Sequence, residues 1–125
     1  MRQFRDTPYY VDEEGTVWRH WKRKVVRYSY TDIVSEEKWK PLKPQTVAGG
    51  YKMITLYFGN GKVDKQPILL HRMVAELYVP GYFEGAHVDH IDCNNQNNHP
   101  SNLQWCTKEY NSKKKNNPNY PLFQI

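Results

Sequence analysis

The sequence predicts an α+β fold in which a small antiparallel sheet and a short helix precede a strand, loop, strand and helix unit. Three patterns support this class: apolar alternation with a period of two within residues 9–58, a helical repeat in residues 69–80, and an asparagine-rich loop between two short strand patterns after residue 86. The chain of 125 residues has the length of one domain. Within it we expect an N-terminal sheet module at 1–69, a second unit at 70–116 and a tail at 117–125.

The strands of the N-terminal module are expected around two glycine turns. In YYVDEEGTVWRH, Gly15 separates two short apolar runs, which predicts a hairpin. In GGYKMITLYF, a Gly-Gly turn precedes a strand whose alternation places Met53 and Thr55 on one face and Ile54 and Leu56 on the other. We therefore expect a small antiparallel sheet.

The charge distribution favours a polyanionic partner for this module. The chain has a net charge of +5, and residues 1–70 carry 13 basic and 8 acidic residues, whereas residues 71–125 carry 5 of each. In the run WRHWKRK, rings alternate with basic groups, which suits contacts with the phosphates of double-stranded DNA. The alternative is a solvated strand edge defended by charge. The candidate DNA contacts in this run are Arg19, Lys22, Arg23 and Lys24.

A short amphipathic helix should follow the sheet and pack on it. Its apolar positions keep helical spacing until Pro80 ends the run. His71 at its start is interpreted as a hydrogen-bonding residue of the helix terminus, or, together with Arg72, as a phosphate contact.

No disulfide framework, signal peptide or membrane segment is indicated. The two cysteines are too few for a stapled secreted scaffold, and the N-terminus lacks an apolar stretch. We expect a soluble, cytoplasmic protein without membrane or protein partners.

The last unit carries the residues best suited to chemistry. Asp89 is a hard oxygen ligand of the kind that Mg²⁺ prefers, and His90 can accept a proton near neutrality. The alternative for an isolated Asp-His pair is a turn residue followed by a satisfied polar side chain. Neighbouring strand residues face opposite sides, so both can serve one site only where the strand ends or bends.

The spacing within this unit favours the chemical interpretation. Asn111 follows Asp89 by 22 positions and falls on the first turn of a helix that Thr107 can cap, so its amide oxygen is a candidate second metal ligand. Asn102, in the intervening segment, can tie the long loop to the backbone and fix the direction of His90.

At these residues the sequence resembles a known family. LHRMVAELYV, HVDHIDCNNQNN, SNLQWCT and EYN are similar to the HNH endonucleases of the ββα-metal superfamily, of the type found in phage genomes and self-splicing introns, and the upstream strands resemble the sheet module of many homing endonucleases. The resemblance implies a ββα-metal nuclease core in which Asp89 and Asn111 bind a divalent metal, Mg²⁺ with Mn²⁺ as a substitute. It also implies that His90 is the general base and that Asn102 positions the loop.

Two residues depart from the family pattern. Cys93 stands where the family usually has glycine, and Asn111 stands where many members have a metal-binding histidine. An amide oxygen in place of an imidazole favours Mg²⁺ or Mn²⁺ over softer metals.

The histidines and cysteines of this unit, and the lysines at its end, have other interpretations. His87, His90, Cys93 and Cys106 could be counted as a zinc set, but they lack the pairwise spacing of zinc sites. The terminal run Lys113–Lys115 offers further DNA contacts at Lys113 and Lys114, or it complements the helix dipole.

The expected function is metal-dependent hydrolysis of DNA that leaves a 5′ phosphate and a 3′ hydroxyl. One Asp-His pair with one suitably spaced Asn predicts a single site, which nicks one strand unless two chains assemble. The alternatives are a non-cleaving DNA-binding protein with the same fold and a phage structural or host-interaction protein.

Overall fold

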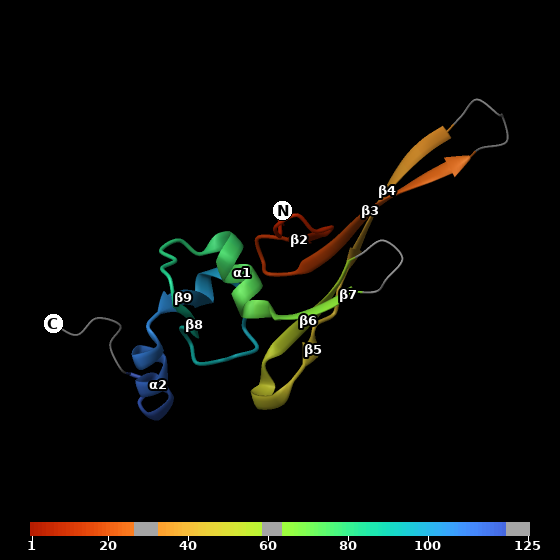
Figure 1. Cartoon of the computed structure of the whole chain (residues 1–125). Helices are drawn as coiled ribbons and strands as arrows, with labels where there is room; N and C mark the ends of the chain where they lie inside the picture. Colours follow the sequence, from red (N-terminus) through yellow and green to blue (C-terminus); the bar gives the residue numbers. More distant parts are fainter. Residues whose placement is uncertain (27–32, 59–63, 120–125) are drawn as a thin grey trace.

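The computed structural model describes residues 1–26, 33–58 and 64–119, and for residues 22–26, 33–36, 58 and 64 it describes the backbone alone. Its strands form three antiparallel sheets with the orders β1-β2-β3-β4, β5-β6-β7 and β8-β9 (Figure 1). The first sheet contains β1 (Arg2–Gln3), β2 (Tyr9–Val11), β3 (Val17–Val26) and β4 (Ile33–Pro41). The second contains β5 (Gln45–Thr46), β6 (Lys52–Phe58) and β7 (Asp64–Leu69), and the third contains β8 (His87–His90) and β9 (Leu103–Cys106).

The expected N-terminal sheet is thus divided into two sheets. The division falls at the segment PLKP, whose Pro41 and Pro44 lack the N–H groups that a continued strand ladder needs. The β3–β4 hairpin extends away from the rest of the molecule (Figure 1). The β2–β3 turn and the turn before β6 lie close to the second unit, since Gly15 approaches Asn98 and Gly50 approaches Asn95.

The hairpin predicted around Gly15 is present. Gly15 has a φ of 87°, which a residue with a side chain rarely adopts. The Asp12 carboxylate accepts hydrogen bonds from the N–H groups of Glu14 and Thr16, both at 2.9 Å, and from Trp18 Nε1 at 3.0 Å. These bonds lower the pKa of Asp12 despite the opposing effect of burial. The turn is therefore held by the Asp12 side chain as well as by the conformation of Gly15.

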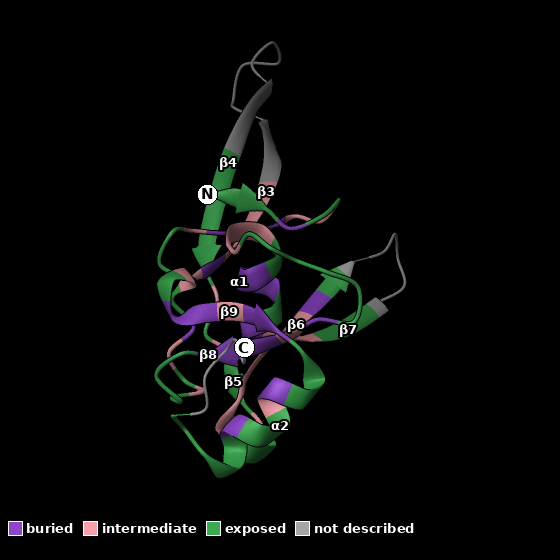
Figure 2. Cartoon of the chain, turned by 90° about the vertical axis from the view of Figure 1, so that its left-hand side faces the viewer, coloured by how far each residue is buried: buried purple, intermediate pink, exposed green. Residues whose placement is uncertain are grey.

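Helix α1 (Leu70–Tyr78) lies between the N-terminal sheets and the β8-β9 sheet (Figure 1). It buries Met73, Val74 and Ala75 completely. The predicted alternation in β6 is confirmed, since Ile54 and Leu56 are buried and Tyr57 is exposed. One core results, and it runs from Phe4 in the N-terminal module through α1 to Trp105 in β9 (Figure 2). At about 25 cal/mol per Å² of apolar surface, this shared burial ties the two halves of the chain together.

The second unit has the predicted order of strand, loop, strand and helix. Strand β8 pairs with β9, the 3₁₀ helix η2 (Pro100–Asn102) ends the loop between them, and α2 (Lys108–Asn116) follows β9. Thr107 caps α2 as expected, because its hydroxyl accepts the Tyr110 N–H at 3.1 Å. Neither helix of the described segments is long and apolar enough to cross a membrane.

Candidate active site

A pocket of about 440 Å³ opens at the end of β8, between α1, α2 and the turn before β6. It contains the sequence-predicted residues Asp89, His90, Asn111, Arg72 and Lys114 in its lining. The other members of the lining are Tyr51, Leu69, His71, His87, Val88, Cys93, Asn95, Lys115 and Pro118.

Asp89 and His90 share this pocket because β8 ends at His90. The chain turns immediately afterwards, with the Cys93 N–H donating to the His90 carbonyl at 2.9 Å. Cys93 has a φ of 63° in this turn, a left-handed conformation that costs a side-chain-bearing residue about 1–2 kcal/mol. The left-handed backbone at Cys93 is therefore the physical reason why glycine suits this position.

Asn98 holds the ring of His90. Both side chains are buried, and His90 Nε2 lies 2.8 Å from Asn98 Oδ1. A carbonyl oxygen can only accept, so Nε2 carries the hydrogen and Nδ1 keeps its lone pair. Nδ1 has no hydrogen bond with the described residues, and it is the nitrogen that can accept a proton. Sequence reasoning missed Asn98, since nothing in the run of asparagines distinguishes it.

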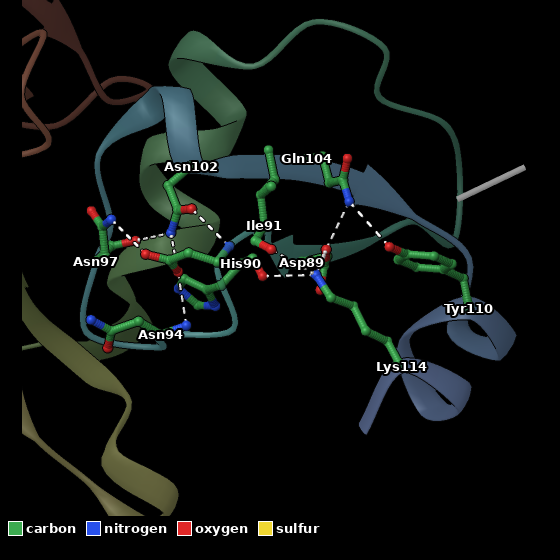
Figure 3. A network of polar contacts seen from close by, with 10 residues as sticks. Asp89, His90, Ile91, Asn94, Asn97, Asn102, Gln104, Tyr110 and Lys114 are labelled. Atoms are coloured by element: carbon green, nitrogen blue, oxygen red, sulfur yellow. Dashed lines mark hydrogen bonds and ion pairs between the residues drawn. The ribbon is translucent and has the colours of Figure 1, made fainter. Parts of the chain in front are cut away.

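Asn102 organises the loop, and the hydrogen bonds of its side chain go to Asp92 and Asn97 and not to His90. Its Nδ2 donates to Asp92 Oδ1 at 2.9 Å and to the Asn97 carbonyl at 2.8 Å, while its Oδ1 accepts the Asp92 N–H at 3.0 Å (Figure 3). Hydrogen bonds from Asn97, the Asn94 backbone and Asn102 lower the pKa of Asp92. The asparagines thus form a hydrogen-bonded loop around one carboxylate.

The N-terminal module supports this loop from outside at two glycine turns. An ideal Cβ on Gly15 would lie 2.6 Å from the Asn98 backbone oxygen, so only glycine permits this approach. At the turn before β6, Asn95 Nδ2 donates to the Gly49 carbonyl at 2.5 Å. The residue that orients His90 is therefore packed against a hairpin about 80 residues earlier in the chain.

Asp89 is buried between β9 and α2. Its Oδ2 accepts hydrogen bonds from Gln104 Nε2 at 2.7 Å and from Lys114 Nζ at 2.6 Å (Figure 3). Burial lowers the pKa of Lys114, but the hydrogen bond and charge of Asp89 outweigh it and raise that pKa overall. Lys114 was expected as a DNA contact; its side chain is only 7% exposed, and its ammonium faces the end of β8.

The donor set at the pocket fits a hard divalent cation. Asp89 Oδ1 makes no hydrogen bond with the described residues, and Asn111, half-buried on the first turn of α2, lines the same pocket. A carboxylate and an amide oxygen are ligands that Mg²⁺ and Mn²⁺ accept, with water and phosphate oxygens completing the shell. Asp89 and Asn111 therefore remain the candidate ligands.

Nothing supports the zinc interpretation. The described residues contain no group of three or more His, Cys, Asp or Glu side chains that could hold a metal. Burial and the charge of Asp89 raise the pKa of Cys106 to about 11, so its thiol stays protonated, and Cys93 is exposed in the turn.

His71 does not make the hydrogen bond at the helix terminus that one of its two sequence interpretations predicted. The ring is only 8% exposed, and its Nδ1 has no hydrogen-bond partner in the described chain. It packs between Tyr51 and His90, with ring centroids 5.5 Å and 5.0 Å away. Burial, followed by the charges of His90 and Arg72, lowers the pKa of His71 to about 4. A neutral imidazole thus forms one wall of the pocket.

The predicted basic residues are distributed unevenly around the site. Arg72 is exposed and lines the pocket, and Lys113 is exposed on α2. Arg19 is half-buried, with its guanidinium 5.5 Å from the Tyr9 ring centroid and 5.8 Å from that of Trp21. The side chains of Lys22, Arg23 and Lys24 lie outside the described residues.

Comparisons with known proteins relate the segment that lines most of this pocket to one family. Residues 69–113 match the HNH endonuclease family. The chain is 40% identical over 81 residues to the DNA endonuclease I-HmuI of Bacillus phage SP01 and 39% identical over 79 residues to an uncharacterized HNH endonuclease of Acanthamoeba polyphaga mimivirus. These alignments cover 64% and 63% of this chain but 44% and 23% of the relatives.

A structural match extends over nearly the whole chain. A solved structure of the HNH homing endonuclease I-HmuI, which concerns DNA binding and cleavage by that protein, superimposes with a TM-score of 0.66 at 29% sequence identity. The match covers 98% of this chain and 57% of the other. The chain therefore shares the HNH endonuclease fold, and it spans less than half the length of the curated relatives that it matches.

Proposed function

We propose that this chain, which is related to the HNH endonucleases through residues 69–113 and through its fold, hydrolyses DNA with the help of a divalent metal. The observation that carries the proposal is the convergence of Asp89, His90 and Asn111 on one pocket. Two oxygen ligands beside an oriented imidazole are the components of metal-assisted phosphodiester hydrolysis.

Each residue has a defined task in this proposal. His90 Nδ1 accepts the proton of the attacking water, because Asn98 keeps the hydrogen on Nε2. Asp89 and Asn111 hold the metal, which when bound neutralises the charge that develops on the phosphate and the leaving 3′ oxygen. Asn102 acts indirectly by ordering the loop that carries Asn98. The products are a 5′ phosphate and a 3′ hydroxyl.

Double-stranded DNA is the proposed substrate, held by its phosphates. Arg72 lines the pocket and Lys113 is exposed on α2, while the proposed contacts Arg19, Lys22, Arg23 and Lys24 follow one another along the backbone of β3. Replacing these four β3 residues by Ala should lower DNA affinity and flatten its salt dependence by about one unit of slope per lost phosphate contact. An unchanged slope would place the DNA surface elsewhere, at Arg72 and α2.

We further propose that the chain nicks one strand. One Asp-His pair and one matching Asn make one site, which breaks one phosphodiester in each binding event. Supercoiled plasmid should accumulate first as the open circle. Linear DNA as the earliest product, at a rate that rises with the square of protein concentration, would show that a dimer is the active form.

The decisive test is plasmid cleavage with Mg²⁺ or Mn²⁺, with and without EDTA. His90→Ala should abolish nicking while metal and DNA binding persist, because the substitution removes a base and not a ligand. His99→Ala is the matched control, since His99 is exposed and, among the described residues, its ring forms hydrogen bonds only with Ser101. Cleavage by His90→Ala at the wild-type rate would disprove the assignment.

A non-cleaving DNA-binding protein is the second candidate. The ammonium of Lys114 on Asp89 favours it, because one ligand oxygen is already engaged by a cation. DNA binding without EDTA-sensitive nicking would support this alternative.

A further inference from the structure

The ammonium of Lys114 is surrounded by oxygen atoms at the strand end. It lies 2.6 Å from Asp89 Oδ2, 2.9 Å from the His90 carbonyl oxygen and 3.3 Å from that of Ile91 (Figure 3). An ammonium has three N–H donors, and these three acceptors can satisfy them all. Lys114 is only 7% exposed. Its positive charge is therefore buried in the pocket to which Asp89 and Asn111 contribute oxygen atoms as candidate metal ligands.

The Asp89 carboxylate depends on this charge when no metal is bound. Lys114 is the one charged partner of Asp89 within the described segments, and Gln104 supplies a hydrogen bond but no charge. Removing the partner of a buried carboxylate is strongly destabilising. The two carboxylate oxygens are used differently: Oδ2 accepts both hydrogen bonds, and Oδ1 accepts none from the described residues. One carboxylate can therefore face the ammonium on one oxygen and a metal on the other.

The helix geometry places both functions on one face of α2. Lys114 follows Asn111 by three positions, so their side chains lie on the same side of the helix. The contact that Lys114 makes with β8 thus also holds α2, which carries Asn111, against the strand that carries Asp89. Lys114 therefore balances the charge of Asp89 and also helps to position α2.

We propose that Lys114 is a resident counter-cation of the metal site, which shares Asp89 with the divalent metal, keeps the metal-free site folded and weakens metal binding. This inference rests on the proposed function, because it takes Asp89 as a metal ligand. Its consequence is that the protein should fold without metal and bind the metal only moderately tightly.

The test compares Lys114→Met with Lys115→Met. Methionine keeps the apolar stem and removes the charge, and Lys115 is an exposed neighbour that lines the same pocket without bonding Asp89. Both variants change the net charge equally, so a general charge effect would appear in both. The melting temperature is measured in EDTA and in saturating Mn²⁺, and the Mn²⁺ dissociation constant is measured by electron paramagnetic resonance.

For Lys114→Met we expect a melting temperature in EDTA lower by about 10 °C or more. Saturating Mn²⁺ should restore most of that loss, and the Mn²⁺ dissociation constant should fall by about tenfold or more because a like charge has been removed. Lys115→Met should stay close to the wild type in both quantities. A loss of the same size in EDTA and in Mn²⁺, with unchanged Mn²⁺ affinity, would overturn the proposal and leave Lys114 as a structural clamp.

A measurement on the wild type covers the case in which Lys114→Met does not fold. The ¹⁵Nζ resonance of Lys114 should shift with Mg²⁺ along the same binding curve as the side-chain amide of Asn111, while that of Lys115 stays in place. Absence of a Lys114 shift, while Asn111 responds, would overturn the proposal and leave the metal site intact. Absence of any Mg²⁺ or Mn²⁺ binding to the wild type would instead remove the metal-dependent function as well.

Discussion

His71 should make the stability of this protein fall as the pH is lowered. Its imidazole is buried beside Tyr51 and His90 with Nδ1 unpartnered, and its pKa is lowered to about 4 from the ordinary 6.5. The unfolded chain therefore takes up a proton below about pH 6.5 that the folded chain takes up only below about pH 4. Since the unfolded state binds more protons in this window, acidification favours unfolding.

The size of the effect follows from the two pKa values. The full difference of 2.5 units corresponds to about 3.4 kcal/mol, and between pH 7.5 and pH 4.5 the loss from this one group is about 2.5 kcal/mol. His71→Phe keeps a ring of similar size and cannot be protonated. At pH 7.5 the variant should be as stable as the wild type or more stable by up to about 1 kcal/mol, because an unpartnered buried nitrogen is removed.

The assay is urea unfolding of both proteins at pH 7.5 and pH 4.5. Other histidines and carboxylates titrate in both proteins, so the difference between the two pH-dependent losses isolates His71. We expect the wild type to lose about 2.5 kcal/mol more than His71→Phe. Equal losses would show that His71 is free to ionise in the folded protein and that the assigned burial does not govern its pKa.

Three further changes test the loop and its supports. Asn98→Ala should slow nicking by about ten- to a hundredfold while leaving Mn²⁺ affinity unchanged, because His90 Nε2 loses its acceptor; an unaltered rate would remove Asn98 from the site. Gly15→Ala should lower both the melting temperature and the nicking rate, since its Cβ would stand 2.6 Å from the Asn98 oxygen. Gly81→Ala, with a similar positive φ and no neighbour within 4 Å, is its control and should lose stability through backbone strain alone. Cys93→Gly should raise the free energy of unfolding by about 0.5–1 kcal/mol, because glycine avoids the cost of a left-handed backbone but loses more conformational entropy on folding. A decrease measured by urea unfolding would show that the Cys93 side chain packs favourably.

Local patterns in the sequence were sufficient to predict β6, α1 and part of the candidate site. The period of two in β6 and the helical repeat of α1 are properties of neighbouring residues, and both elements formed where predicted. The Thr107 cap likewise acts over three positions. Asp89 and His90 stand side by side in the chain, so their joint presence in the pocket required only that β8 end there.

The remaining parts of the site depend on contacts between distant segments. From the sequence, Lys114 is expected to be an exposed lysine in a basic run. Its ammonium contacts Asp89, 25 positions earlier, because α2 packs on β8. Asn98 differs from its asparagine neighbours only because the loop folds back over His90 and against Gly15. Sequence periodicity records which face of an element is apolar, whereas the partner of a buried charge or imidazole is chosen by how separate elements pack. For this reason the sequence by itself determined the strand, loop, strand and helix order and the candidate ligands, and the tertiary structure decided how the base is oriented and which cation balances Asp89.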